Sequence, residues 1–282
     1  RLPFYLSVCY YFFESNRLYK LVYNQTYPLY NINRLFLMTT LIIKVDFLSN
    51  IYLYNAFTYI KNYKKVYYMY SSQFGQDEYL ETNVFKGFKD GFFVDVGAHN
   101  GLSINNTTYF EKNNNWTGIN IEPIKKVFDR LVVNRPNNVN LNCAVCNEDG
   151  ETEFLCNTGY TEMISGIKST FDPRHMFRLQ RENQQQGSTT ELIKVNTKRL
   201  ETIFDEHKVS HVHYLSIDVE GAEFEVIKSI NFDKVFIDVI GFENNYNDVS
   251  VPIVKYLQEK NYIVIHVSLD IFMIRKDSSF YK

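Results

Sequence analysis

The chain has 282 residues, of which 45% are hydrophobic, and its formal net charge at pH 7 is −2. This length and apolar fraction suit one large globular domain with an appendage and exclude a disordered or fibrous protein. The near-neutral charge gives no global basic field, so the composition does not favour nucleic acid as a partner.

An N-terminal extension, residues 1–70, is rich in Tyr, Phe, Leu and Asn. We predict that it is helical, with amphipathic helices within Leu41–Tyr70 that cover a sheet edge; a membrane-surface or partner-binding segment is the alternative. The chain starts with Arg1 instead of Met, so the extension is also compatible with a gene-prediction artefact. The apolar run Leu35–Ile43 is too short to span a bilayer, and we expect an intracellular protein without a transmembrane segment.

The most informative stretch is Gly91–Gly101, which reads Gly-Phe-Phe-Val-Asp-Val-Gly-Ala-His-Asn-Gly. Phe92–Val96 is predicted to be a strand buried on both faces of a parallel sheet. The two glycines after it allow a sharp turn and the close approach of a ligand. A crossover helix is predicted over Ser103–Asn113, so loop amides and a helix N-terminus would face that ligand beside Asp95.

A second strand is predicted within Trp116–Pro123, and it ends in Glu122. An acid about 20 residues after the glycine turn is placed to accept hydrogen bonds from the two hydroxyls of a ribose. The apolar residues of Ile124–Val132 recur at helical spacing, which predicts a helix, and Val139–Asn142 is a third short strand.

Two extra strands, Glu151–Cys156 and Glu191–Asn196, flank a polar insertion at residues 156–190. A connection of this length within a domain is usually functional or disordered. We predict a substrate lid that includes His175, and a disordered insertion is the alternative. Its arginines would suit an anionic or sugar-phosphate acceptor, or they form a solvated helix face.

A fourth strand within Tyr214–Glu223 is followed by clustered acids, which are costly to bury unless they bind something. Val235–Ile240 is the fifth strand. Val251–Lys260 is a predicted helix with Pro252 in its first turn. The strands Tyr262–Val267 and Ile271–Arg275 would then close the sheet as an antiparallel hairpin. The pair His211-x-His213 has the look of metal ligands, but only one further acid is near in sequence, and metal binding there is not favoured.

Taken together, these stretches resemble the FkbM-type S-adenosylmethionine-dependent methyltransferases over Ser71–Lys276. The resemblance implies an α/β fold: a Rossmann-like, seven-stranded class I methyltransferase sheet with an antiparallel last strand, occupying residues 71–282. The matching motifs are Ser72-Gln73-Phe74-Gly75-Gln76-Asp77, Phe93 to Gly101, Gly118 to Pro123, and Ile217-Asp218-Val219-Glu220-Gly221-Ala222-Glu223.

The resemblance also implies a site. The first loop would pack under the methionine part of S-adenosylmethionine, Glu122 would hold the ribose, and Ala144 would lie near the adenine. The residues expected to bind the cofactor are Asp95, Gly97, Ala98, Asn100, Gly101, Glu122, Pro123, Ala144 and Gln73.

For catalysis we assign Glu220 and Asp218. Glu220 is the first choice to take a proton from an acceptor hydroxyl, because the glycine after it leaves room for substrate. His175 and Glu243 are expected to contact the acceptor. We predict no metal; the alternative is a divalent cation at Asp218 and Glu243-Asn244, which resemble the Mg²⁺ sites of some small-molecule O-methyltransferases.

The predicted function is O-methylation of a small molecule, sugar or glycan. One alternative is an NAD-type oxidoreductase, although the loop is Asp-x-Gly-x-x-x-Gly instead of Gly-x-Gly-x-x-Gly. Another is a non-catalytic interaction protein that keeps the fold. Nucleic-acid methylation is not favoured, because the Asn/Asp-Pro-Pro-Tyr/Phe loop of amino methyltransferases is absent from the sequence.

Overall fold

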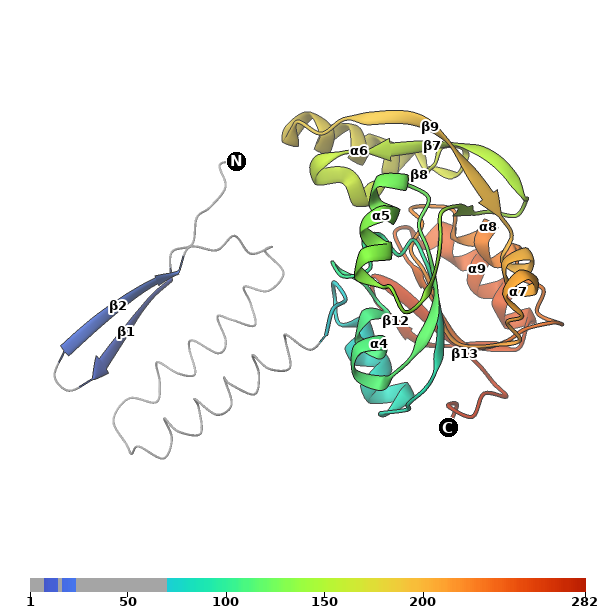
Figure 1. Ribbon diagram of the computed structural model, residues 1–282, viewed down its shortest axis with the longest axis horizontal. Coiled ribbons are helices and arrows are strands. Elements are labelled where there is room, and N and C mark those ends of the chain that lie inside the picture. The colour runs from blue at the N-terminus through green and yellow to red at the C-terminus, as the bar shows by residue number, and fades with distance from the viewer. Residues whose placement is uncertain (1–7, 15–16, 24–69) are drawn as a thin grey trace. The chain divides into compact units, whose positions relative to one another are not determined.

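The computed structural model describes residues 8–14, 17–23 and 70–282 (Figure 1). The chain divides into two compact units, residues 1–67 and 68–282. Among the described residues, no helix has both the length and the apolar character needed to cross a membrane.

The first unit contains an antiparallel strand pair, β1 (Val8–Glu14) and β2 (Arg17–Tyr23). The prediction of a helical extension is therefore wrong for these two segments. The amphipathic helices expected within Leu41–Tyr70 fall outside the described residues, apart from Tyr70 itself.

The second unit is built from alternating strands and helices. In chain order they are α3 (Gln76–Tyr79), η2 (Leu80–Phe85), β3 (Phe92–Val96), α4 (Thr108–Asn114), β4 (Thr117–Ile121), α5 (Lys125–Asn134), β5 (Val139–Leu141), β6 (Ala144–Val145), β7 (Gly150–Asn157), η3 (Gly159–Ile164), β8 (Gly166–Ile167), η4 (Lys168–Thr170), α6 (Pro173–Gln186), β9 (Thr190–Lys198), α7 (Leu200–His207), β10 (His211–Ile217), α8 (Glu223–Lys228), β11 (Phe236–Glu243), α9 (Asn247–Glu259), β12 (Tyr262–Val267) and β13 (Asp270–Arg275).

The main sheet has seven strands in the order β12-β13-β11-β10-β3-β4-β5. Neighbouring strands among β11, β10, β3, β4 and β5 pair in parallel, whereas β13 is antiparallel to both β11 and β12. This arrangement confirms the predicted seven-stranded sheet and its antiparallel closing strand.

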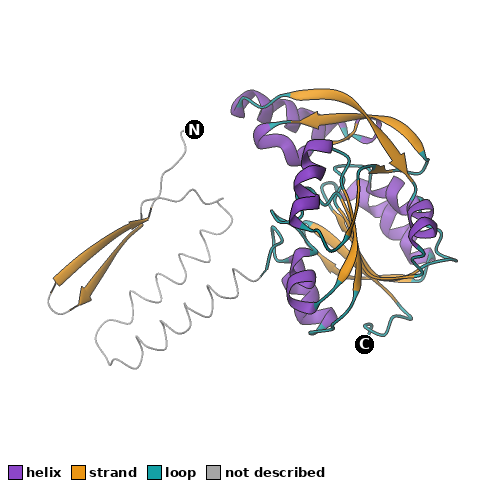
Figure 2. Ribbon diagram, viewed as in Figure 1, coloured by secondary structure: helices purple, strands orange, loops and turns teal. Residues whose placement is uncertain are grey.

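Helices cover both faces of this sheet, with α4 and α5 on one side and α7, α8 and α9 on the other (Figures 1 and 2). Alternation along β3 divides the core between the two faces. Val94 and Val96 pack with residues of α7, α8 and α9, whereas Phe93 packs with residues of α4 and η2. The same alternation directs Asp95 to the α4 face, beneath the loop that leaves β3.

A second sheet, with the order β6-β9-β7-β8, forms around the polar insertion. Its centre is the antiparallel pair of β7 and β9, in which Asn157 lies opposite Thr190. The two extra strands were therefore predicted correctly. The segment between them is ordered as η3, β8, η4 and α6, which contradicts the alternative of a disordered insertion.

Two helices begin at other residues than predicted. Helix α4 starts at Thr108 instead of Ser103, because two asparagine side chains satisfy the preceding amides. Asn100 Oδ1 accepts from the amide of Ser103, and Asn105 Oδ1 accepts from the amide of Thr108. Helix α9 starts before the predicted residue, so Pro252 lies beyond its first turn, within the helix.

Candidate functional site

The loop after β3 turns sharply at Gly97, where φ is +87°. A Cβ at this position would lie 1.8 Å from the carbonyl oxygen of Asp218. The amides of Gly97 and Ala98 both donate to the carbonyl of Ile121, at 3.0 Å each. Glycine is therefore required at position 97 because the ends of β3 and β10 meet there, and this contact fixes the floor of the site.

Gly101, the second glycine of the loop, packs against α5 and the residue after it. Its φ is +73°, and a Cβ there would lie 2.6 Å from side-chain atoms of both Leu131 and Arg135. Asn100 beside it accepts hydrogen bonds from the amides of Leu102 and Ser103. Both residues thus shape the loop and seat it on α5, within the same turn that positions Gly97.

Asp95 supports this loop from below. Its side chain is buried, and Oδ2 accepts hydrogen bonds from Asn105 Nδ2 and Thr107 Oγ1 at 2.8 Å each. Burial raises the pKa of Asp95, and the charge of the buried Arg135 opposes that rise. Arg135 also pairs with Glu111. The carboxylate is therefore engaged by the protein itself.

A cavity of about 420 Å³ opens above Gly97, at the carboxyl ends of β3, β4, β10 and β11. Ligands of open α/β sheets bind at this edge. Of the residues predicted from sequence, those in its wall are Gln73, Gly97, Ala98, Glu122, Pro123, Ala144, Asp218, Glu220 and Glu243. The wall does not include four others, which are Asp95, Asn100, Gly101 and His175.

Glu122 forms one side of the cavity. It is only 5% exposed, its Oε1 accepts from the amide of Ile124 at 2.8 Å, and its carboxylate also accepts from the amide of His99. Burial raises the pKa of Glu122 to about 7 from an ordinary value of 4.5, although the two amide hydrogen bonds oppose the shift. A carboxylate has about four lone-pair sites, so two remain for hydroxyl donors from a ligand.

Three acids, Asp218, Glu220 and Glu243, form the opposite side, and carboxylate oxygens of all three lie within 4.8 Å of one another. The surrounding protein and, next, the charge of Glu220 raise the pKa values of Asp218 and Glu243 well above their ordinary values, although the Asp218 side chain is still exposed in the cavity. Perturbed acids that converge on a cavity are typical of a functional site. They also have the chemistry of a hard-cation site.

His175 lies behind Glu220. Its side chain is 4% exposed, and its Nε2 is 3.0 Å from Glu220 Oε2. The sequence predicted a contact between His175 and the acceptor, but the structure places it against a wall residue instead.

The insertion forms the roof of the cavity, and it supplies wall residues that sequence reasoning missed. Glu162 on η3 pairs with His99 of the loop at 2.9 Å and with Arg130 of α5. Arg178 on α6 lines the cavity and donates to Glu182 at 2.9 Å. The spacing of Arg178 and Glu182 was an available signal for their pair. The partners of Glu162 lie far from it along the chain, so no local pattern indicated them.

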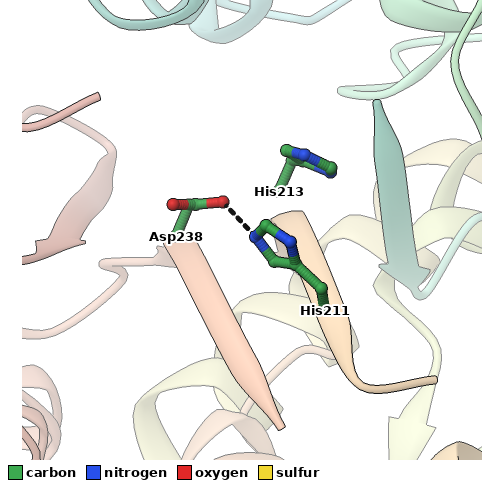
Figure 3. A group of neighbouring side chains, drawn as sticks. All are labelled: His211, His213 and Asp238. Carbon is green, nitrogen blue, oxygen red and sulfur yellow. Dashed lines mark hydrogen bonds and ion pairs between the residues drawn. The ribbon is translucent and has the colours of Figure 1, made fainter. Parts of the chain in front are cut away.

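A second group of potential ligands, His211, His213 and Asp238, lies near the opposite ends of the strands (Figure 3). His211 Nε2 is 2.7 Å from Asp238 Oδ2, and His213 Nδ1 accepts from the amide of Phe92 at 2.9 Å. That bond uses the one lone pair of a neutral imidazole. The two rings are stacked, with centroids 4.4 Å apart, so their in-plane nitrogens do not converge on one ion. The group is accounted for by its own contacts.

No curated protein matches this chain. A crystal structure of precorrin-6y C5,15-methyltransferase from Geobacter metallireducens GS-15 aligns with 66% of this chain and 80% of that chain, at 10% identity and a TM-score of 0.35. This likeness is too weak to bear on the activity.

The family match is decisive. Residues 95–264 match the family described as the methyltransferase FkbM domain, from the end of β3 to the middle of β12. The match includes Glu122, Asp218, Glu220 and Glu243, and it favours methyl transfer over the oxidoreductase alternative. Since it spans more than half of the chain, the protein belongs to the FkbM methyltransferase domain family and is a methyltransferase.

Proposed function

We propose that the protein uses S-adenosylmethionine to methylate a hydroxyl oxygen of an uncharged small molecule, sugar or glycan. One observation carries this proposal. One cavity has the buried carboxylate of Glu122, a hydrogen-bond acceptor, on one side and the acids Asp218, Glu220 and Glu243 on the other. Gly97 forms the floor between them.

The residues present fit this cofactor. Two lone-pair sites of Glu122 remain for the two ribose hydroxyls, and Ala98 and Ala144 offer a small, apolar surface beside it. S-adenosylmethionine carries a sulfonium and an ammonium group. Six carboxyl groups lie in the cavity wall, against His99 and Arg178, so the wall complements a cation. Those carboxyl groups belong to Glu122, Glu162, Glu182, Asp218, Glu220 and Glu243.

The same wall argues against an anionic acceptor. Arg178 already donates to Glu182, and Arg174 is paired with Asp172 and Asp248 outside the wall. These arginines are therefore partly neutralised, and an incoming phosphate would meet more carboxylates than cations. A neutral hydroxyl-bearing acceptor fits this field better than the sugar phosphate that the arginines of the insertion first indicated.

When bound, S-adenosylmethionine supplies a methyl group activated by its positively charged sulfur. The chain must align the acceptor and receive the hydroxyl proton. We assign proton removal to Glu220, which lies in the cavity wall, in the turn that follows β10. Asp218 and Glu243 flank Glu220 in the wall, where their carboxyl groups are placed to hydrogen-bond to the acceptor.

The test is methyl transfer from S-adenosylmethionine labelled in its methyl group to a panel of neutral sugars, sugar phosphates and amines. We expect an alkali-stable methyl ether on a neutral acceptor and little product on sugar phosphates. Glu220→Gln should lower kcat by about 100-fold or more, the usual contribution of a general base. Methylamine products, or a preference for phosphorylated acceptors, would overturn the acceptor assignment.

A further inference from the structure

We infer that His175 is a positioning residue for Glu220: it holds the carboxylate through Oε2 and leaves Oε1 to serve the acceptor. This inference rests on the proposed function. It differs from the contact with substrate that the sequence suggested for His175.

Two buried atoms, one from each residue, lie in contact. His175 Nε2 and Glu220 Oε2 are 3.0 Å apart. Neither atom has an aligned hydrogen bond among the described residues, not even to the other, so their contact is a close approach of an imidazole nitrogen and a carboxylate oxygen. An unpaired buried polar atom costs about 1–3 kcal/mol, and the electrostatic contact with the other atom offsets part of this cost for each of them.

The backbone around His175 is fixed. His175 lies in the first turn of α6, whose N-cap Asp172 accepts from the amide of Arg174 at 2.7 Å. Pro173 occupies the first helical position, where its fixed φ suits a helix. The Phe171 ring packs edge-on against the imidazole, with centroids 5.2 Å apart. The imidazole therefore has little freedom to leave Glu220.

Two glycines let this part of the insertion pack directly on the turn that carries Glu220. Glu220 itself has φ +55°, a conformation that is strained for a residue with a side chain. A Cβ at Gly221 would lie 2.9 Å from the carbonyl of Thr170, and one at Gly166 would lie 2.6 Å from the Phe171 ring. The start of α6 and the Glu220 turn thus form one packed unit.

The charges around Glu220 also favour a nitrogen partner for its carboxylate. Glu220 shares its side of the cavity with Asp218 and Glu243, so an ionised Glu220 faces like charge. His175 offsets that repulsion by presenting a ring nitrogen, and Arg178 is the other nearby cation, since its pKa responds to Glu220. Asp172 and Glu223 also lie near His175, whose charge lowers the pKa of each of these two acids. A neutral or charged imidazole N–H would hold the Glu220 carboxylate in one orientation.

The kinetic test compares His175→Leu with His175→Gln, whose amide nitrogen occupies nearly the position of Nε2 and keeps a donor. His175→Leu should lower kcat by about 10- to 100-fold with the KM for the acceptor unchanged, because misplacing a catalytic group by about 1 Å costs this much. His175→Gln should recover most of kcat. His207→Gln, at the exposed end of α7, is the matched control and should change neither constant. A raised KM with kcat unchanged would instead place His175 on the substrate and overturn the inference.

A second measurement separates this inference from the proposed function, because it needs no acceptor. In the ¹⁵N-histidine-labelled full chain, NMR should show a downfield imidazole N–H proton that disappears in His175→Gln. The same resonance should move upfield or be lost in Glu220→Gln, because its carboxylate partner is gone. An unchanged resonance in Glu220→Gln would refute the pair, whether or not methyl transfer is found.

Discussion

Replacing Glu122 by Gln should make the free protein more stable at alkaline pH while it weakens cofactor binding. The side chain is buried, and its pKa is raised to about 7 from 4.5. Because the folded pKa is the higher one, this group's contribution to the free energy of unfolding is full below pH 4.5. It is lost as the pH rises through 7. Gln has nearly the shape of Glu but does not ionise, so the variant does not lose this part of the free energy of unfolding as the pH rises.

The magnitude follows from linkage. Between pH 5 and pH 8, a shift from 4.5 to about 7 lowers the free energy of unfolding of the wild-type protein by about 2.5 kcal/mol through this group alone. Glu223, whose pKa is also raised to about 7 by burial, adds a similar trend, but it is present in both proteins. The difference between the variant and the wild type therefore isolates Glu122.

The assay is urea denaturation of both proteins at pH 5 and pH 8 without ligand. The stability of Glu122→Gln relative to the wild type should rise by about 2.5 kcal/mol from pH 5 to pH 8. Its affinity for S-adenosylmethionine should fall by about 10- to 100-fold, because a hydrogen bond to a charged acceptor is worth about 1.5–3 kcal/mol. A stability difference that does not change with pH would refute the reasoning.

Three further predictions follow from the same geometry. Gly97→Ala places a Cβ 1.8 Å from the Asp218 carbonyl and should lower the free energy of unfolding, measured by urea denaturation, by more than about 3 kcal/mol. The control Gly187→Ala has nothing within 4 Å of the new Cβ and should lower it by only about 1–2 kcal/mol. Asp95→Asn should lower both the melting temperature and the affinity for S-adenosylmethionine, because Asp95 holds the loop beneath the cavity; a normal melting temperature with lost affinity would mean direct contact with the cofactor. Methyl transfer should persist in excess EDTA, because His175 and Arg178 already offset the acids around Glu220, and a loss that Mg²⁺ restores would instead assign a metal to those acids.

Most of the main sheet was predictable because its signals are local. Phe92–Val96 and the closing hairpin have strand-like apolar runs bounded by turn residues, and the structure has strands there. Helix α6 was foreseen only as the alternative of a solvated helix face, and its bounds were not predicted, because it buries only His175 and Leu179 and so leaves almost no apolar periodicity. The start of α4 was missed because Asn105 satisfies amides that a helix would otherwise use.

The site was predictable where function follows from position at a strand end. Glu122, Asp218 and Glu243 follow or end strands of one sheet edge, and the structure brings them to one cavity. Gly101 fits the same motif, but a sequence cannot distinguish a glycine that faces a ligand from one that faces Arg135. Wall residues from the insertion, such as Glu162, depend on how a second sheet packs over the first, and no local pattern encodes that packing.

The most direct test of the account is calorimetric titration of S-adenosylmethionine into the purified full chain, with NAD titrated in parallel. We expect one-to-one binding of S-adenosylmethionine, weakened in Glu122→Gln, and no binding of NAD. Absence of S-adenosylmethionine binding by the folded protein, or binding of NAD at the same site, would contradict it.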